Sequence, residues 1–329
     1  MEEKGRYMRR VDTVKIRIGF FLSAFVLGAM LSASGWAAEV WVTNIKSGDV
    51  YVIDPASLEV VVTIPAGKGA HNVTISRDGK LAFVANVGAN NVTIIDAVDK
   101  KVLANVAAGT KTHDVSLSPD GSLAVASNVG EGTITPIDIA QRTAIHTMPT
   151  DEKAIMSLFS PDGKRLFVAN AGAATISVVD VGTREVTKTL PGGRGMMAFV
   201  PTADWKLAWL TAPADDQLII LNLARAEIVA RIDVPGEPHG LVLSPDGTRA
   251  YVIQRKLNQL AVVDTSSRRV IKTAQVGKRP DMLAISSDGA TLYVTSRNEN
   301  KLLVVSASDL AVLGEVATGE EPHGVAYRE

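Results

Sequence analysis

Residues 71–106 read HNVTIS RDGK LAFVAN VGAN NVTIID AVDK KVLANV, so four β-rich runs alternate with short polar segments. The β-branched residues of the runs favour strands, and the Gly, Asp and Asn residues between them favour turns. One repeat further on, the Ser-Pro-Asp-Gly sequence of Ser118–Gly121 predicts a tight hairpin, because proline presets φ and glycine accepts a left-handed conformation. The stretch therefore predicts a unit of four antiparallel strands.

This unit recurs every 42 residues. Asp-Gly dipeptides begin at positions 78, 120, 162, 246 and 288, and the copy expected in between reads Asp204-Trp205. A second marker follows the same spacing and is a polar residue at the end of the third strand: Asp54, Asp96, Asp138, Asp180, Asn222, Asp264 and Ser306. Four strands at a period of 40–50 residues are typical of a propeller blade. We expect an all-β fold, a seven-bladed β-propeller with four antiparallel strands per blade.

The two ends of the repeat array complement each other. Glu39–Asn44 (EVWVTN) aligns with second strands and has no first strand before it, whereas His323–Arg328 aligns with first strands and has nothing after it. We expect this C-terminal strand to complete the N-terminal blade and to close the ring, which leaves no open sheet edge. Residues 39–329 are therefore predicted to form a single domain.

The first 38 residues have the pattern of a secretory signal peptide. Basic residues precede a 14-residue apolar run, Ile18–Leu31, and small residues follow it, which predicts cleavage near 35–38 and leaves Met1 or Met8 as the start. A helix of 14 residues rises about 21 Å, less than the ~30 Å hydrocarbon core of a bilayer. We expect a periplasmic or secreted protein with no membrane span after cleavage; the alternative is an uncleaved membrane tether.

Composition excludes several classes of function. The 34 basic and 35 acidic side chains nearly balance, which argues against a nucleic-acid partner, because such binding needs a basic surface. The chain has no cysteine, so disulfides, thiolate metal sites and cysteine nucleophiles are excluded. Catalytic motifs such as Gly-x-Ser-x-Gly and His-Glu-x-x-His are also missing from the sequence.

The repeats resemble those of the YVTN-repeat β-propellers. The resemblance rests on WVTN at 41–44, FVAN at 83–86 and 167–170, and YVTS at 293–296, together with the SPDG turns. It implies a seven-bladed propeller that is often periplasmic or secreted. Members of that family include scaffolds, binding proteins and relatives of lactonases and haem-binding propellers, so the resemblance does not fix a function.

One repeat position gathers the residues that could carry chemistry. Seven residues occupy the start of the innermost strands, in ring order His323, His71, His113, Ile155, Met197, His239 and Asp281. We expect them to lie at one level around the central channel and take His71, His113, His239, His323, Asp281 and Met197 as candidate ligand or channel residues. Imidazole and carboxylate suit zinc, copper or ferrous iron. The candidate metal ligands are His323, His71, His113, Asp281 and His239.

Two other interpretations of the histidines remain open. Pro-His-Gly, as at Pro238–Gly240, is a common entry to an inner strand, so the histidines could be inherited copies that bond to neighbouring carbonyls. They could also serve an organic ligand or a proton transfer. The fifth repeat, with its Gly192–Met197 run and Asp204-Trp205, is interpreted as drift in a turn that needs less glycine, with a methionine-containing binding face as the alternative. His146 is expected on the surface.

The sequence thus supports three functional hypotheses. The leading one is a non-enzymatic binding or protein-interaction propeller without a cofactor, a monomer that holds an unidentified protein or small molecule on a loop face. The second is a metal- or haem-binding propeller that uses the histidine ring for electron transfer or cofactor handling. The third is a lactonase-like hydrolase. No residue is assigned a catalytic role.

Overall fold

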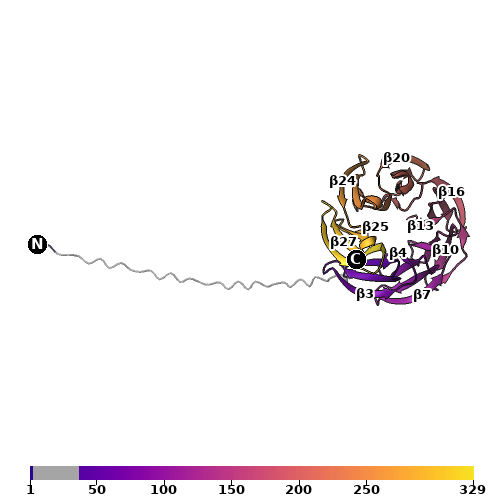
Figure 1. The fold of residues 1–329 in the computed structure, drawn as a ribbon, viewed down its shortest axis with the longest axis horizontal. Helices are drawn as coiled ribbons and strands as arrows, with labels where there is room; N and C mark the ends of the chain where they lie inside the picture. Colours follow the sequence, from indigo (N-terminus) through magenta and orange to yellow (C-terminus); the bar gives the residue numbers. More distant parts are fainter. Residues whose placement is uncertain (3–36) are drawn as a thin grey trace. The chain divides into compact units, whose positions relative to one another are not determined.

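The computed structural model describes Met1, Glu2 and residues 37–329. Of the predicted signal peptide, residues 1–38, only the first two and the last two residues are described, so the signal-peptide prediction lies outside the described residues. Residues from Glu39 onward form seven antiparallel sheets arranged in a ring, as Figure 1 shows. The predicted all-β, seven-bladed propeller with four strands per blade is confirmed, and the described residues contain no α-helix.

Each blade runs from an innermost strand at the centre of the ring to an outermost strand at its rim. In that order, blade 1 comprises β29 (Pro322–Arg328), β1 (Glu39–Asn44), β2 (Asp49–Asp54) and β3 (Glu59–Pro65). Blade 2 comprises β4 (Ala70–Ile75), β5 (Leu81–Asn86), β6 (Asn91–Asp96) and β7 (Lys101–Ala107). Blade 3 comprises β8 (Thr112–Leu117), β9 (Leu123–Asn128), β10 (Thr133–Asp138), and the short strands β11 (Thr143–Ala144) and β12 (Met148–Pro149).

The remaining blades follow the same order. Blade 4 comprises β13 (Ala154–Phe159), β14 (Arg165–Asn170), β15 (Thr175–Asp180) and β16 (Glu185–Pro191). Blade 5 comprises β17 (Phe199–Pro201), β18 (Leu207–Ala212), β19 (Gln217–Asn222) and β20 (Glu227–Asp233). Blade 6 comprises β21 (Pro238–Leu243), β22 (Arg249–Gln254), β23 (Gln259–Asp264) and β24 (Arg269–Gln275). Blade 7 comprises β25 (Pro280–Ile285), β26 (Thr291–Ser296), β27 (Lys301–Ser306) and β28 (Val312–Ala317).

The hydrophobic core lies between the blades rather than inside any one of them. Both faces of the two middle strands are covered by neighbouring sheets, so these strands are buried almost throughout, whereas the outermost strands are largely exposed. Between blades 1 and 2, for example, Trp41 and Ile64 pack with Val84 and Ile95. Each such seam depends on two neighbouring sheets, which makes the ring a cooperative structure.

Turn chemistry accounts for most of the repeated polar residues. In the first hairpin of blade 3, Asp120 accepts hydrogen bonds from the Ser118 hydroxyl and the Ser122 backbone N–H, while Gly121 takes φ +71°. Trp205 adopts the same left-handed region, with φ +54°. The interpretation that this turn needs less glycine is therefore wrong: the backbone is unchanged, and Trp205 packs against Phe167, with ring centroids 5.7 Å apart.

The ring closes as predicted. β29 pairs with β1 in antiparallel register, with Val40 opposite Tyr327 and Glu39 opposite Arg328. The Arg328 Nη1 donates to Glu39 Oε2 at 2.7 Å, and Lys100 of the next blade approaches the same carboxylate at 2.5 Å. Burial raises the pKa of Glu39, but the hydrogen bonds from Lys100 and Arg328 outweigh it and hold the pKa below its usual range. The Glu39 carboxylate thus connects the N-terminal strand β1 with the C-terminal strand β29 and with blade 2.

Two blades depart from the regular pattern. In blade 3 the outer strand is split into β11 and β12, and exposed His146 lies in the gap between them, on the surface as expected. In blade 5 the inner strand β17 is reduced to three residues.

Short 3₁₀ turns connect the second and third strands of blades 5, 6 and 7: η1 (Pro213–Asp215), η2 (Arg255–Leu257) and η3 (Arg297–Glu299). Within the described part of the chain, no helix has the length and apolar character to cross a bilayer.

Candidate ligand site at the centre of the ring

The site is built by a bulge that recurs in the inner strands. The pairing of β4 with β5 shifts between Ala70 and Asn72, and the pairing of β8 with β9 shifts between Thr112 and Asp114. The residue left out of register is the ring residue, His71 in the first case and His113 in the second. A bulge bends the strand and redirects a side chain. Contacts between the inner strands of neighbouring blades place these redirected residues around the centre of the ring.

Every ring histidine is bonded to the next ring residue through its Nδ1 atom. His323 Nδ1 lies 3.2 Å from the carbonyl oxygen of His71, and His71 Nδ1 lies 3.1 Å from that of His113. The same contact joins His113 to Ile155 at 2.7 Å and His239 to Asp281 at 3.0 Å. A carbonyl oxygen only accepts, so Nδ1 carries the proton and the neutral ring has a lone pair at Nε2. The tautomer is therefore the same in all four histidines.

The histidine rings also lie against one another, tilted by 35° between His71 and His323 and by 44° between His71 and His113. The ring centroid of His71 lies 3.8 Å from that of His323 and 4.1 Å from that of His113, and His239 meets His323 edge-on at 5.9 Å. Burial lowers the pKa of His71, His239 and His323 well below the usual histidine value, and charge repulsion within the cluster adds to the effect for His71 and His323. Burial lowers the pKa of His113 to about 4. The ring is neutral at physiological pH.

Asp281 is the one charged member of the ring position and is fully buried. Its Oδ1 meets Arg255 Nη2 at 2.5 Å, and its Oδ2 meets Arg297 Nη1 at 3.3 Å. Each arginine also binds a glutamate, Glu237 for Arg255 and Glu321 for Arg297. Five alternating charges thus stabilise the buried carboxylate, because guanidinium groups and carboxylates compensate each other in a low-dielectric setting.

The two arginines were not among the residues predicted from the sequence, although a signal was available. Arg255 and Arg297 lie 42 residues apart, at a repeat position where the other five copies are apolar. Asp114 was also missed; it follows His113 and accepts a hydrogen bond from Asn72 Nδ2 at 3.2 Å. Burial raises the pKa of Asp114 to about 7, against the lowering effect of hydrogen bonds from the Val115 backbone and Asn72.

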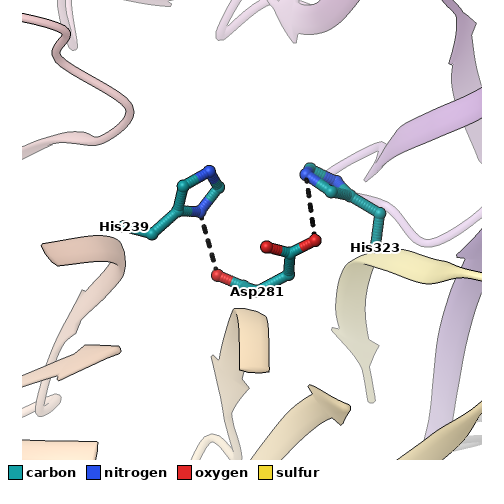
Figure 2. Close-up of side chains that lie close together, drawn as sticks. All are labelled: His239, Asp281 and His323. Carbon is teal, nitrogen blue, oxygen red and sulfur yellow. Dashed lines mark hydrogen bonds and ion pairs between the residues drawn. The ribbon is translucent and has the colours of Figure 1, made fainter. Parts of the chain in front are cut away.

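Three of the five candidate metal ligands come together. Figure 2 shows His239, Asp281 and His323 facing one another, and one ligand atom from each lies within 4.8 Å of the others. His323 Nε2 and Asp281 Oδ2 are 4.0 Å apart. His71 packs against His323 with a tilted ring, and His113 packs against His71 in the same way, so both lie outside this group. We call His239, Asp281 and His323 the triad.

The remaining ring positions are apolar. Ile155 is buried, and the half-buried Met197 precedes the shortened strand β17 rather than lying in it. The backbone N–H groups of Met197 and Ala198 both donate to the Thr211 hydroxyl, which replaces the missing strand pairing there. Met196, the preceding methionine, is fully buried in the core between blades 4 and 5. Met197 is therefore not brought to the triad by any contact that the structure records.

Comparisons with solved structures find propellers of similar shape. Hydrazine synthase of Kuenenia stuttgartiensis is 18% identical with a TM-score of 0.74, covering 82% of this chain and 92% of that one. The periplasmic gluconolactonase PpgL of Pseudomonas aeruginosa is 21% identical with a TM-score of 0.74, covering 89% and 99%. Dihydro-heme d1 dehydrogenase NirN in complex with DHE is 15% identical with a TM-score of 0.67, covering 88% and 74%. At these identities the likeness shows the fold alone.

Sequence comparison gives a family. No curated protein matches the chain. A family model described as the YNCE-like beta-propeller matches residues 21–122 and 133–284. The match covers most of the chain and agrees with the propeller architecture, whereas the finer YVTN-repeat assignment stays a prediction. The chain belongs to the YNCE-like β-propeller family.

Proposed function

We propose that this protein is an exported, non-enzymatic binding propeller that holds its ligand at the histidine ring. The observation that supports it most directly is the state of the imidazole Nε2 atoms. Nδ1 of each histidine is committed to a backbone carbonyl, and among residues 37–329 no hydrogen bond reaches any of the four Nε2 atoms. None of these Nε2 atoms is among the fully enclosed side-chain atoms that lack a partner, so all four stay accessible to a ligand at the centre of the ring. Four lone pairs left open in one place favour an external partner.

The interpretation of the histidines as inherited repeat residues explains only part of this arrangement. It accounts for the bonds from Nδ1 to the neighbouring carbonyls, which are the contacts that it predicts. It gives no reason why two of these histidines should meet a buried carboxylate, with one ligand atom each from His239, Asp281 and His323 within 4.8 Å of the others.

A binding role is favoured over hydrolysis by the surroundings of the hydroxyl groups. A serine or threonine nucleophile needs a base within hydrogen-bonding distance. In the described part of the chain, no serine or threonine hydroxyl is hydrogen-bonded to a histidine ring; Ser116, for example, pairs with Ser157, and Thr43 donates to the carbonyl of His71. Export to the periplasm is proposed from the signal-peptide pattern of the first 38 residues.

Native mass spectrometry of the protein purified from the periplasmic fraction tests this proposal. The comparison is with the triple variant His71→Asn, His113→Asn, His323→Asn, because asparagine can still donate to the neighbouring carbonyl but offers no atom at the Nε2 position. We expect a stoichiometric non-covalent adduct on the native protein that the variant lacks. Adduct-free native protein whose melting temperature is unchanged by added periplasmic extract would refute the proposal, as would lactone turnover that disappears in the variant.

A further inference from the structure

The chemistry of the central cluster restricts what can bind there. Four neutral imidazoles present acceptor lone pairs at Nε2, and Asp281 adds a carboxylate, which is also an acceptor. The nearby guanidinium groups, Arg255 and Arg297, already bind Asp281, Glu237 and Glu321. A group of acceptors whose neighbouring cations are already paired is complementary to a further cation.

The triad has the donor set and the spacing of a site for a transition-metal ion. Two imidazole nitrogens and a carboxylate are a common set of three protein ligands, with an open coordination position left for an exchangeable group. Ligand atoms about 2.0–2.2 Å from a tetrahedral ion lie roughly 3.4 Å apart. One ligand atom from each triad residue, with either ring nitrogen counted for a histidine, lies within 4.8 Å of the others, and His323 Nε2 lies 4.0 Å from Asp281 Oδ2. Closure by about 1 Å would therefore complete the site.

The surroundings of the triad already orient two of its ligands. His239 Nδ1 donates to the Asp281 carbonyl and His323 Nδ1 donates to the His71 carbonyl, so each ring presents Nε2 in the tautomer that a metal requires. Outer hydrogen bonds of this kind fix the ring orientation and strengthen metal binding. The three carboxylates of Asp281, Glu237 and Glu321 are matched by three cations, because Lys256 also pairs with Glu237. A divalent ion would therefore add two positive charges, which an anionic fourth ligand would partly neutralise.

On the basis of the proposed binding function, we propose that the ligand includes one first-row divalent transition-metal ion, held by His239 Nε2, His323 Nε2 and the Asp281 carboxylate. His71 and His113 lie outside this coordination sphere; His71 packs against the His323 ring, and His113 packs against His71. A further small molecule with an anionic oxygen would bind the ion at its open coordination position.

Titration of the metal-stripped full-length protein with Zn²⁺ alone tests the site, followed calorimetrically near pH 7.5. We expect one ion per chain and a dissociation constant below about 1 μM, in the range of three-ligand protein sites. His239→Asn and His323→Asn should each weaken binding by more than ~100-fold, because loss of a direct ligand exceeds the 10–100-fold effect of an outer-shell change. His146→Asn is the control, because His146 is exposed on the outer edge of blade 3, outside the histidine ring, and this variant should bind as the unaltered protein does.

Co²⁺ provides an independent readout, because a four-coordinate site gives visible absorption bands that a surface-bound ion does not. The bands should be present in the His146→Asn variant and absent from both triad variants. Circular dichroism shows that each variant is folded, and Asp281→Asn replaces a variant that is not. No stoichiometric binding of Zn²⁺ or Co²⁺, or equal binding by His146→Asn and His239→Asn, overturns the metal site. If the adduct lost in the ring triple variant is nonetheless present, the binding function stands and only the metal is wrong.

Discussion

At the scale of single residues, the histidine ring shows how one repeated position acquires different properties in different blades. The four histidines share a backbone bulge, a Nδ1 contact and a tautomer, yet only His239 and His323 approach Asp281. The difference comes from the neighbours: a carboxylate held by two arginines on one side, and Ile155 and Met197 on the other. The same side chain therefore lies in a polar environment near Asp281 and in a more apolar one near Ile155 and Met197.

The neutral ring makes stability dependent on pH. Unfolded histidine binds a proton below about pH 6.5, whereas native His113, with a pKa of about 4, does not. The unfolded state then binds more protons, so the stability present above pH 6.5 is lost progressively as the pH falls from about 6.5 to about 4. For His113 alone the loss is on the order of 3 kcal/mol.

Urea unfolding at several pH values between 7.5 and 4.5 measures this loss. The His113→Asn variant should show a shallower dependence on pH than the unaltered protein. His146→Asn is the control, because His146 is exposed on the outer edge of blade 3 and its replacement should leave the slope unchanged. Groups that face His113, above all His71 and Asp114, are the same in both proteins and cancel in the comparison. Equal slopes for all three proteins would contradict the prediction.

At the scale of the strand, blade 3 shows what a single proline does to an otherwise regular sheet. Pro136 lies in the interior of β10 and has no N–H to donate to the outer strand, although its carbonyl accepts from Ile145 at 2.7 Å. The outer strand is accordingly split into β11 and β12, where the other blades have one continuous strand.

Replacing Pro136 by valine should join the two short strands. Blades 4 and 6 have valine at this position, Val178 and Val262, and their outer strands are unbroken. One restored backbone hydrogen bond should raise the free energy of unfolding by about 1 kcal/mol, measured by urea unfolding. Amide exchange of residues 143–149 should slow at the same time. Unchanged exchange there, with unchanged stability, would show that Pro136 is not the cause of the break.

At the scale of the whole molecule, the ring depends on its closure. The strand β29 supplies the inner edge of blade 1, the ring residue His323 and the Tyr327 ring that stacks on Tyr293 at 5.6 Å. The seam between blades 7 and 1 contains Val40, Val42, Tyr293 and Leu302. Without β29, the apolar residues between blades 7 and 1 lose the strand that packs against them. The strand β1 then becomes an exposed sheet edge that can pair with other chains.

Deletion of residues 322–329 should therefore destabilise the whole propeller rather than one blade. We expect the melting temperature to fall by more than about 10 °C, equivalent to several kcal/mol in a domain of this size, with self-association in size-exclusion chromatography. Deletion of the exposed Glu329 alone is the control and should leave both properties unchanged. A shortened chain that melts cooperatively at the original temperature would show that closure is dispensable.

The sequence by itself determined the architecture, because that information is local and repeated. Ser-Pro-Asp-Gly turns set the hairpins, the 42-residue spacing set the number of blades, and the unmatched strands at the two ends set the closure. The same spacing placed His71, His113, His239, His323 and Asp281 at one level. Trp205 shows the limit of such inference, because a residue uncommon in a left-handed turn adopts that conformation when its ring has a neighbour to pack against.

Only the tertiary structure decided how the ring residues meet. Distances across the centre depend on the bulges in the inner strands and on contacts between residues many positions apart, such as His323 with His71 and Asp281 with Arg255. A repeat period specifies which residues are equivalent but not how far apart their side chains lie. For that reason the sequence offered five equal candidate ligands, whereas the folded ring brings three together and surrounds one of them with arginines.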